Sequence, residues 1–199
     1  LIDKDRPVVQ EGSFHFNDGL FNNCPDWVCL YGFFQTEKYF KNIEQEIRED
    51  FRFKDDILIP CKEMMDEFGE PPLSLHIRRG DFLINSANHH NLDLDYYEKA
   101  LAEFPVEVPV LIFSDDPEWC SGQELFADDR FLVAEGNSPY VDMCLMSLCE
   151  GHIIANSSFS WWGAWLANSQ KVVAPSVWFG PNNAHLDIKD LYLDHWEVI

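Results

Sequence analysis

The chain has 199 residues, of which 46% are hydrophobic and 15% aromatic, so it can bury a core and is not expected to be disordered. Its 35 acidic and 14 basic residues give a formal net charge of -21, which disfavours nucleic acid and anionic lipid surfaces as partners, because both are bound by clustered lysine and arginine. No apolar run approaches the roughly 20 residues that cross a bilayer, and no leader opens the chain, so no integral membrane segment is expected.

The first 70 residues are expected to form a partial amino-terminal region with a linking helix. The aromatic-rich segment GSFHFNDGLFN, residues 12–22, is expected to be extended, and TEKYFKNIEQEIREDF, residues 36–51, has the spacing of an amphipathic helix. Pro60 and the turn-forming sequence EFGEPP, residues 67–72, indicate a boundary. The chain is therefore divided into residues 1–70 and a second domain over residues 71–199.

From residue 73 onward, short apolar strands alternate with helical patterns. Strands are expected over residues 73–78, 108–113, 130–134, 152–155 and 171–175, and helices over residues 94–104, 139–150 and 159–168. Asp116 and Pro117 fit the N-cap and first position of a further helix. Strict alternation predicts an α/β fold, with a Rossmann-like parallel sheet and helices on both of its faces.

Polar residues follow three of these strands directly. Sheets of this kind bind ligands outside the carboxyl ends of their strands, so these residues are expected to meet in one crevice. The three groups are His76, Arg78, Arg79 and Asp81, then Ser114, Asp115 and Asp116, then Asn156, Ser157 and Ser158.

The sequence HIRRGD gathers two of the few positive charges at one strand end. Arginine binds phosphate through two parallel hydrogen bonds, so Arg78 and Arg79 fit an anionic ligand there. Gly80 permits a sharp turn, and Asp81 can hold an arginine through a charge-assisted hydrogen bond. An exposed strand end with a salt bridge is the alternative. The tripeptide from Arg79 to Asp81 is not expected to be a cell-adhesion ligand, because it follows a strand.

The sequence ANSSFSWWGAW places Asn156, Ser157 and Ser158 before a helix that is expected to begin at about Phe159. Unpaired N–H groups at a helix N-terminus bind phosphate, although an ordinary serine cap is the alternative. The crevice position makes Asn156 an implausible glycosylation site. Core packing is expected for Trp161, Trp162 and Trp165 rather than a role as a sugar-binding platform.

Asp142 lies one turn into the apolar helix of residues 139–150, where a carboxylate is unusual. A carboxylate can accept two hydrogen bonds from the Watson–Crick edge of guanine, which makes Asp142 a candidate for base recognition. The alternative is a charge that is stabilised by the helix dipole.

No metal site is expected. Asp93-Leu94-Asp95 has the D-x-D form of some metal-dependent glycosyltransferases, but a capping box formed by Asp95 and Glu98 explains it better. His89 and His90 lie in a polar loop without a second ligand pair. The six cysteines form no C-x-x-C pair, and Cys144 and Cys149 lie on an apolar helix where free thiols pack as small hydrophobes, which favours a reducing compartment.

Taken together, the segments LHIRRGDF, LDLDYYEKAL, LIFSDDPEWC and LMSLCEGHIIANSSFSWWGAWLA resemble the successive motifs of glycosyltransferase family 11, the α-1,2-fucosyltransferases. The segment LYGFFQTEKYFKNIEQEIREDFRF is also similar to a stretch of that family. A run of five ordered motifs is highly specific, and the resemblance covers nearly the whole chain.

The resemblance implies a fold of the GT-B type and an inverting, metal-independent transfer of fucose from GDP-fucose to the 2-hydroxyl of a terminal galactose. The expected partners are the donor and a galactose-terminated glycan, and no cofactor is implied. Residues 71–199 would bind GDP-fucose, and residues 1–70 would lie on the acceptor side. A non-catalytic module that binds a GDP-sugar or a glycan is the first alternative, and transfer from another GDP-sugar such as GDP-mannose is the second.

The resemblance also gives roles to single residues. Arg78 would bind the pyrophosphate and stabilise the leaving GDP with His76 beside it, Asp81 would orient the loop, and Asp142 would bind guanine. The expected catalytic residues are His76, Arg78 and Asp81. The nucleotide-sugar site would comprise Arg78, Arg79, Asp115, Asp142, Asn156, Ser157, Ser158 and Phe159. The base that accepts the galactose proton is left unassigned; Asp81 is one candidate, although a structural role is expected for it.

The family begins with a glycine-rich segment of the type GGLGNQ, which this sequence lacks. The resemblance therefore implies the carboxyl-terminal, donor-binding two thirds of such an enzyme. A cytoplasmic location, with or without membrane association, is expected, or a Golgi location if a segment ahead of residue 1 carries an anchor.

Overall fold

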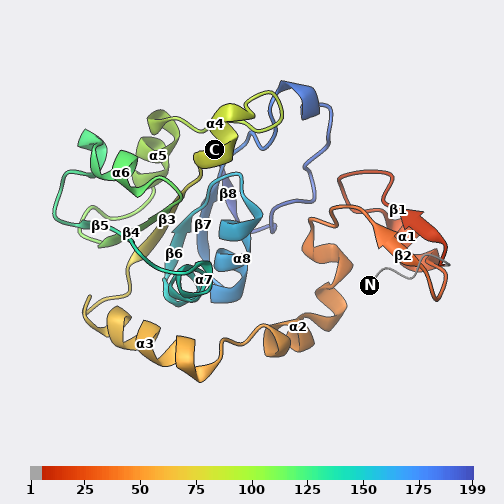
Figure 1. The fold of residues 1–199 in the computed structure, drawn as a ribbon, viewed down its shortest axis with the longest axis horizontal. Coiled ribbons are helices and arrows are strands. Elements are labelled where there is room, and N and C mark those ends of the chain that lie inside the picture. The colour runs from red at the N-terminus through yellow and green to blue at the C-terminus, as the bar shows by residue number, and fades with distance from the viewer. Residues whose placement is uncertain (1–5) are drawn as a thin grey trace.

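A six-stranded parallel sheet organises most of the chain in the computed structural model, which describes residues 6–199 (Figure 1). Its strands lie in the order β5-β4-β3-β6-β7-β8, and every pair is parallel. Their bounds are β3 (Leu73–Ile77), β4 (Val110–Ser114), β5 (Phe131–Val133), β6 (Gly151–Ile153), β7 (Lys171–Ala174) and β8 (Glu197–Val198).

The strand order reverses direction once, between β3 and β6. The chain runs outward from β3 through β4 to β5, returns to the centre with β6, and then runs outward the other way. Neighbouring connections lead away from each other at such a point and leave a crevice outside the carboxyl ends of the two central strands. The predicted Rossmann-like sheet is therefore confirmed.

Helices cover both faces of this sheet (Figure 1). Alternate side chains of a strand point to opposite faces, so Leu73, Leu75 and Ile77 pack with α5 (Leu94–Leu101) on one face. Short α6 (Pro117–Ser121) lies on the same face. The opposite face is covered by α3 (Asp55–Asp66), α7 (Pro139–Leu148) and α8 (Ser158–Ala167).

The helices α7 and α8 approach each other closely through Gly163. A Cβ atom at Gly163 would lie 2.9 Å from the Cβ and the sulfur of Met146 on α7. Trp161 and Trp165 of α8 are buried, and Trp162 stacks on Phe40 and Phe51. The predicted core packing of these tryptophans is confirmed.

The amino-terminal segment forms a small lobe beside the sheet (Figure 1). It contains a two-stranded parallel sheet of β1 (Val8–Gln10) and β2 (Cys29–Tyr31), with α1 (Asp18–Asn23) between them. The prediction of an extended segment over residues 12–22 is wrong in its second half, because Asn17 caps α1 by accepting a hydrogen bond from the Leu20 N–H.

The predicted linking helix is only half α-helical. Residues 36–51 form the 3-10 turns η1 (Glu37–Tyr39) and η2 (Lys41–Ile43) before α2 (Glu44–Asp50) begins. Thr36 caps the first turn, and Phe40 between the two turns has a non-helical backbone. The aromatic side chains of this stretch pack against α8 rather than along one continuous helical stripe.

The prediction that Pro60 marks a boundary is wrong, because Pro60 lies inside α3. Cys61 on the same helix is buried against Leu111, Phe113 and Cys144, so α3 belongs to the packing of the large sheet. The division of the chain at residues 70 and 71 stays a prediction. The remaining elements are α4 (Gly80–Ile84), η3 (Glu124–Phe126) and η4 (Pro181–Asn183).

Within residues 6–199, no helix combines the length and the apolar character that crossing a bilayer requires.

Candidate functional site

A cavity of about 580 Å³ opens at the carboxyl ends of β3, β4 and β6, next to the reversal in strand order. It brings together eight of the predicted site residues, from three strand ends and two helices. They are His76, Arg78, Asp115, Asp142, Asn156, Ser157, Ser158 and Phe159. The predicted meeting of three strand ends in one crevice is confirmed.

Arg78 is held at the cavity wall by two carboxylates. Its Nη1 lies 2.9 Å from Asp115 Oδ2, and its Nη2 donates a hydrogen bond to Asp81 Oδ1. Asp81 does not line the cavity. Two anions on one guanidinium fix its orientation while its remaining N–H groups stay available for a ligand. Asp81 therefore holds the arginine through the charge-assisted hydrogen bond expected from the sequence, while its assignment as a catalytic residue stays a prediction.

The approach of Asp115 to Arg78 depends on Gly80. Asp115 Oδ1 accepts a hydrogen bond of 2.9 Å from the backbone N–H of Arg79. A Cβ atom on Gly80 would lie 2.4 Å from Asp115 Oδ2, which is closer than a non-bonded contact allows. The glycine of HIRRGD thus serves to admit the carboxylate that holds Arg78.

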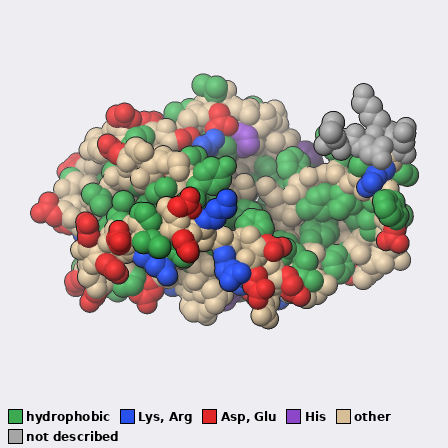
Figure 2. All heavy atoms as spheres, turned by 60° about the horizontal axis from the view of Figure 1, so that its bottom comes forward, with side chains coloured by type: hydrophobic (Ala, Val, Ile, Leu, Met, Phe, Trp, Pro, Cys, Tyr) green, Lys and Arg blue, Asp and Glu red, His purple; other side chains and the backbone are tan. Residues whose placement is uncertain are grey.

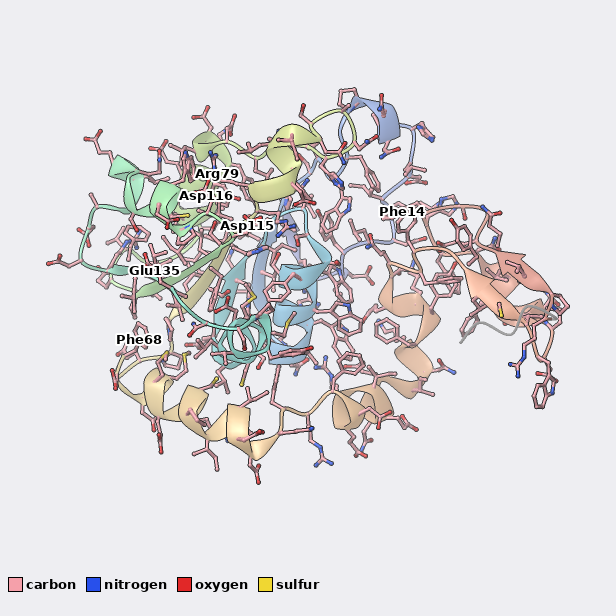
Figure 3. The ribbon with its side chains drawn as sticks, in the orientation of Figure 1. Phe14, Phe68, Arg79, Asp115, Asp116 and Glu135 are labelled. Atoms are coloured by element: carbon pink, nitrogen blue, oxygen red, sulfur yellow. The ribbon has the colours of Figure 1, made fainter. Side chains whose placement is uncertain are left out.

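Arg79 lies outside the set of residues that line the cavity. Its Nε donates to Asp116 Oδ2 at 2.9 Å, and its guanidinium stacks 3.8 Å from the ring centroid of Trp119. Figure 3 shows Arg79 and Asp116 grouped beside Asp115 at this edge of the sheet. The predicted pyrophosphate contact of Arg79 therefore lacks support, because α6 already engages the charge. Arg79 is also the first residue of the tripeptide that ends at Asp81, and these contacts pair its guanidinium within the protein rather than leaving it free for an adhesion receptor.

His76 is buried at the floor of the cavity, with 5% of its surface exposed. Its ring packs against Phe159 at a centroid distance of 5.7 Å, and its Nδ1 finds no hydrogen-bond partner among the described residues. Burial, together with the nearby charge of Arg78, lowers the pKa of His76 to about 3. The ring is therefore neutral near pH 7 and can serve a ligand only as a neutral hydrogen-bonding group.

The Asn-Ser-Ser segment begins α8. Ser157 caps the helix, since its Oγ accepts from the Phe159 N–H at 3.3 Å, so the ordinary cap considered for this serine is present. Ser158 is exposed at the cavity. Asn156 is 3% exposed and its Nδ2 donates to the carbonyls of His90 and Trp178, so its amide nitrogen joins two loops of the cavity wall.

Asp142 reaches the cavity from the first turns of α7. Asn137 donates a hydrogen bond of 3.0 Å to its Oδ1. Burial raises the pKa of Asp142, and the hydrogen bond from Asn137 opposes that shift. The Asp142 carboxylate is partly desolvated, and Asn137 holds one of its oxygens. It can therefore accept hydrogen bonds from a ligand that presents several N–H groups along one edge.

Sequence reasoning missed the aromatic wall of the cavity. Phe82 comes from α4, Phe14 and Phe33 come from the amino-terminal segment, and Trp178 and Phe179 follow β7. Figure 3 shows Phe14 on the loop that faces the sheet from the small lobe. Their positions after short strands gave a weak signal, but aromatic residues in such places usually pack in the core, so the pattern alone did not single them out.

His89, considered above only as a metal ligand, also lines the cavity. No group of three or more histidine, cysteine or carboxylate side chains within the described part of the chain is arranged to hold a metal ion. Asp93, rather than Asp95, caps α5 by accepting from the Tyr96 N–H, so the predicted capping box of Asp95 and Glu98 is wrong and the cap lies two residues earlier. All six cysteines are free, including Cys144 and Cys149 on α7 and its C-cap.

Comparison with known proteins relates this chain to glycosyltransferases. A family model described as "Glycosyl transferase family 11" matches residues 17–199. The O-antigen biosynthesis glycosyltransferase WbnK of Escherichia coli is 35% identical, over 89% of this chain and 64% of the relative. An alpha-1,2-colitosyltransferase of Escherichia coli is 41% identical, over 76% of this chain and 56% of the relative.

More distant matches point the same way. The galactoside alpha-(1,2)-fucosyltransferase 1 of Sus scrofa is 25% identical, over 73% of this chain and 45% of that protein. The crystal structure of NodZ alpha-1,6-fucosyltransferase soaked with GDP-fucose superposes with a TM-score of 0.54 at 16% identity, covering 80% of this chain and 58% of that one. This likeness confirms the fold class. The chain spans less than two thirds of the length of these curated relatives.

Proposed function

Since the chain belongs to glycosyl transferase family 11, we propose that it binds GDP-fucose in the cavity and transfers fucose to the 2-hydroxyl of a terminal galactose, with inversion and without a metal ion. The observation that carries this proposal is the position of Arg78, which is held by Asp81 and Asp115 at the carboxyl-end crevice. Among the described residues that line the cavity, it is the one arginine.

The chemistry of the transfer requires such a group. Breaking the bond between the anomeric carbon and the phosphate oxygen leaves additional negative charge on the nucleotide. An arginine oriented before the reaction stabilises that charge where it develops, and the N-terminus of α8 adds the partial positive charge of its N–H groups. These contributions replace the divalent cation that many glycosyltransferases place on the pyrophosphate.

Calorimetric titration with GDP in the presence of EDTA tests the donor site, with UDP as the control nucleotide. We expect the chain to bind GDP in preference to UDP. Arg78→Ala should weaken GDP binding by roughly 10- to 100-fold, because a charge-assisted contact contributes about 1.5–3 kcal/mol. Arg52→Ala is the matched control, since Arg52 lies on the surface after α2 and away from the cavity. Equal losses in the two variants would argue against the assigned pyrophosphate contact.

Base recognition is assigned to Asp142. Asp142→Asn should reduce the preference for GDP over UDP, because an amide can no longer accept both hydrogen bonds from guanine. In the wild type, GDP affinity should fall as the pH drops through the raised pKa of Asp142, since the protonated carboxyl accepts less well. A variant that retains the full preference for GDP would exclude this role.

The identity to the colitosyltransferase supports a second candidate donor. Colitose is the 3-deoxy form of fucose, so the two sugars share the 6-methyl group and differ by one hydroxyl. Competition of GDP-fucose, GDP-colitose and GDP-mannose for transfer to a galactoside separates the candidates. Preferred use of GDP-colitose would reassign the donor while keeping the linkage, and GDP binding without any turnover would favour the non-catalytic module.

A further inference from the structure

His89 lies on a loop that other backbone segments hold in place. The Gly180 N–H donates to the Asn88 carbonyl at 3.0 Å, and the Asn182 N–H donates to the Ala87 carbonyl at 2.8 Å. A Cβ atom at Gly180 would lie 2.5 Å from the Ser86 carbonyl oxygen, so the two loops are in close backbone contact. This clamping fixes the loop that presents His89 to the cavity.

The His90 carbonyl gives the loop a further anchor. It accepts a hydrogen bond of 2.9 Å from Asn156 Nδ2. The same nitrogen donates to the Trp178 carbonyl at 2.8 Å, so one buried amide ties the loop to the segment after β7. The backbone on both sides of His89 is therefore held by hydrogen bonds, which fixes the position of its side chain as catalysis requires.

The imidazole ring of His89 has a defined orientation. It stacks on Phe82, with 4.1 Å between ring centroids and an angle of 12° between planes. Arg78 lies 5.4 Å from the centroid of the same Phe82 ring. His89 and Arg78 therefore both lie next to the Phe82 ring, and both side chains line one cavity.

An inverting displacement needs a base on the acceptor side of the cavity as well as a cation on the leaving-group side. The attacking hydroxyl must approach the anomeric carbon from the side opposite to the leaving phosphate, so its base must stand away from the pyrophosphate contact by about the width of a sugar ring. A base directly beside Arg78 would lie on the leaving-group side.

The other ionisable groups that line the cavity are already engaged or unsuited. Asp115 is paired with Arg78, and Asp142 accepts from Asn137 at the end of the cavity formed by α7. His76 is buried against Phe159, and its lowered pKa makes it a weak base. The His89 ring makes no hydrogen bond or ion pair with another described side chain. Histidine is the side chain that most often accepts a proton in catalysis near neutral pH.

We propose that His89 is the general base of the transfer reaction, an assignment that rests on the function proposed above. The unprotonated ring nitrogen of His89 accepts the proton of the acceptor hydroxyl as its oxygen forms a bond to the anomeric carbon. The bond from that carbon to the phosphate oxygen breaks, and its electron pair leaves with GDP. The imidazolium then releases its proton to water.

The charged groups near His89 are few. Among the described residues, Arg78 lies near Phe82 and is paired with Asp81 and Asp115, and His76 is neutral in the same cavity. The segment 176–180 that packs against the loop has no ionisable side chain. Because a protonated base cannot accept the hydroxyl proton, the dependence of kcat on pH at saturating donor tests the assignment.

Steady-state transfer from GDP-fucose to a galactoside tests the assignment, with His89→Gln and His89→Ala compared with the wild type. Each should lower kcat on the order of 100- to 10,000-fold, the usual contribution of a general base, while the Kd for GDP changes less than about threefold. The decline of wild-type kcat toward low pH should disappear in His89→Gln. Added imidazole should restore part of the rate of His89→Ala.

His90→Gln is the matched control, because His90 is the neighbouring histidine and does not line the cavity. It should keep the wild-type rate and profile. A His89→Gln variant with an unchanged pH profile, or a His89→Ala variant that imidazole does not rescue, would overturn the assignment while leaving the proposed function intact. A wild-type chain that binds no GDP and transfers no sugar would instead contradict the proposed function itself.

Discussion

Arg78, Gly80, Asp81 and Asp115 act as one unit at the scale of single residues. The two carboxylates fix the guanidinium, and the glycine provides the space in which one of them reaches it. Because the surface is strongly acidic, an arginine with no fixed partner there would have many competing carboxylates. The unit therefore determines where the cavity presents positive charge.

Gly80→Ala should disrupt this unit without unfolding the protein. Gly80 is exposed and begins the short helix α4, so alanine is acceptable to the backbone, but its methyl group would displace the Asp115 carboxylate. We expect GDP affinity to fall roughly tenfold, with a loss of stability below about 1 kcal/mol. Calorimetry and denaturant titration measure the two quantities.

Gly122→Ala is the control for Gly80→Ala. The nearest atoms to a Cβ atom at Gly122 are carbonyl oxygens at 3.5 Å, which is an ordinary contact. Retained GDP affinity in Gly80→Ala would show that Asp115 is not needed to hold Arg78.

Two buried histidines should control acid stability. Burial lowers the pKa of both His76 and His152 to about 3, below the ordinary value of 6.5. The unfolded chain then binds protons that the folded chain does not, so the free energy of unfolding falls as the pH drops from 6.5 toward 3, by up to about 1.4 kcal/mol per pH unit for each histidine.

His152→Asn should therefore reduce the slope of stability against pH between about pH 5 and pH 6.5 by the contribution of one histidine. His152 lies on β6 and does not line the cavity, so GDP binding should persist. Urea titrations over this range give the slope, and His185→Asn, which alters an exposed histidine, should leave it unchanged. Parallel curves for the wild type and His152→Asn would contradict the prediction.

Many of the polar residues of the cavity were predictable because they follow the strands, and parallel topology forces strand ends together. What the sequence could not provide was the direction of each side chain. Arg78 and Arg79 are neighbours of the same type, yet one lines the cavity and the other stacks on Trp119. His89 was not recognised because its role depends on loop contacts with residues more than 60 positions away, such as Asn156.

At the scale of elements, the spacing of α7 and α8 sets one side of the cavity. α7 carries Asp142, α8 begins at Ser158, and Gly163 lets the two helices pack closely over Met146. A larger residue at this contact would separate two elements that both supply cavity residues. Helix packing and ligand binding are therefore coupled here.

Gly163→Ala should destabilise the protein by about 1–3 kcal/mol, the usual cost of overpacking a core. The double variant Gly163→Ala with Met146→Ala should be more stable than the sum of the two single losses predicts, because the smaller side chain relieves the contact. Thermal and denaturant unfolding of the four proteins form the double-mutant cycle. Additive losses would show that the two residues do not compete for space.

The elements themselves were predicted unevenly for a physical reason. Residues 71–199 fold by alternation of strand and helix, and that period is visible in the apolar pattern. The helix α3 was missed because Pro60 stands inside it, where proline normally breaks a helix, while its burial against Leu111 and Phe113 stabilises it. Tertiary contacts of that kind do not appear in a local pattern.

At the scale of the whole molecule, the net charge of -21 dominates the surface. Figure 2 shows acidic side chains spread across the face that it presents, with basic side chains interspersed in smaller number. Like charges at such density repel one another in the folded state, and salt screens that repulsion.

Raising NaCl from about 0.02 M to about 0.3 M should therefore increase Tm by about 2–4 °C, which corresponds to roughly 1 kcal/mol for a chain of this size. Differential scanning calorimetry measures the shift. KCl should act equally, because screening depends on ionic strength rather than on the identity of the cation. A Tm that stays constant or falls would mean that local ion pairs outweigh the general repulsion.

The reversal of strand order between β3 and β6 has a consequence for how the protein is made. Leu73 pairs with Val110 and Gly151 with Lys171, but the central pairing joins Leu73 to Gly151 across the longest interval of sequence. Pairings between distant residues form slowly, because a long loop must close before its contacts are gained. Each half of the sheet can assemble on shorter contacts, whereas the cavity exists only after the halves join and the segment with Trp178 and Phe179 arrives. During synthesis on the ribosome, the binding site is thus one of the last features that the growing chain acquires.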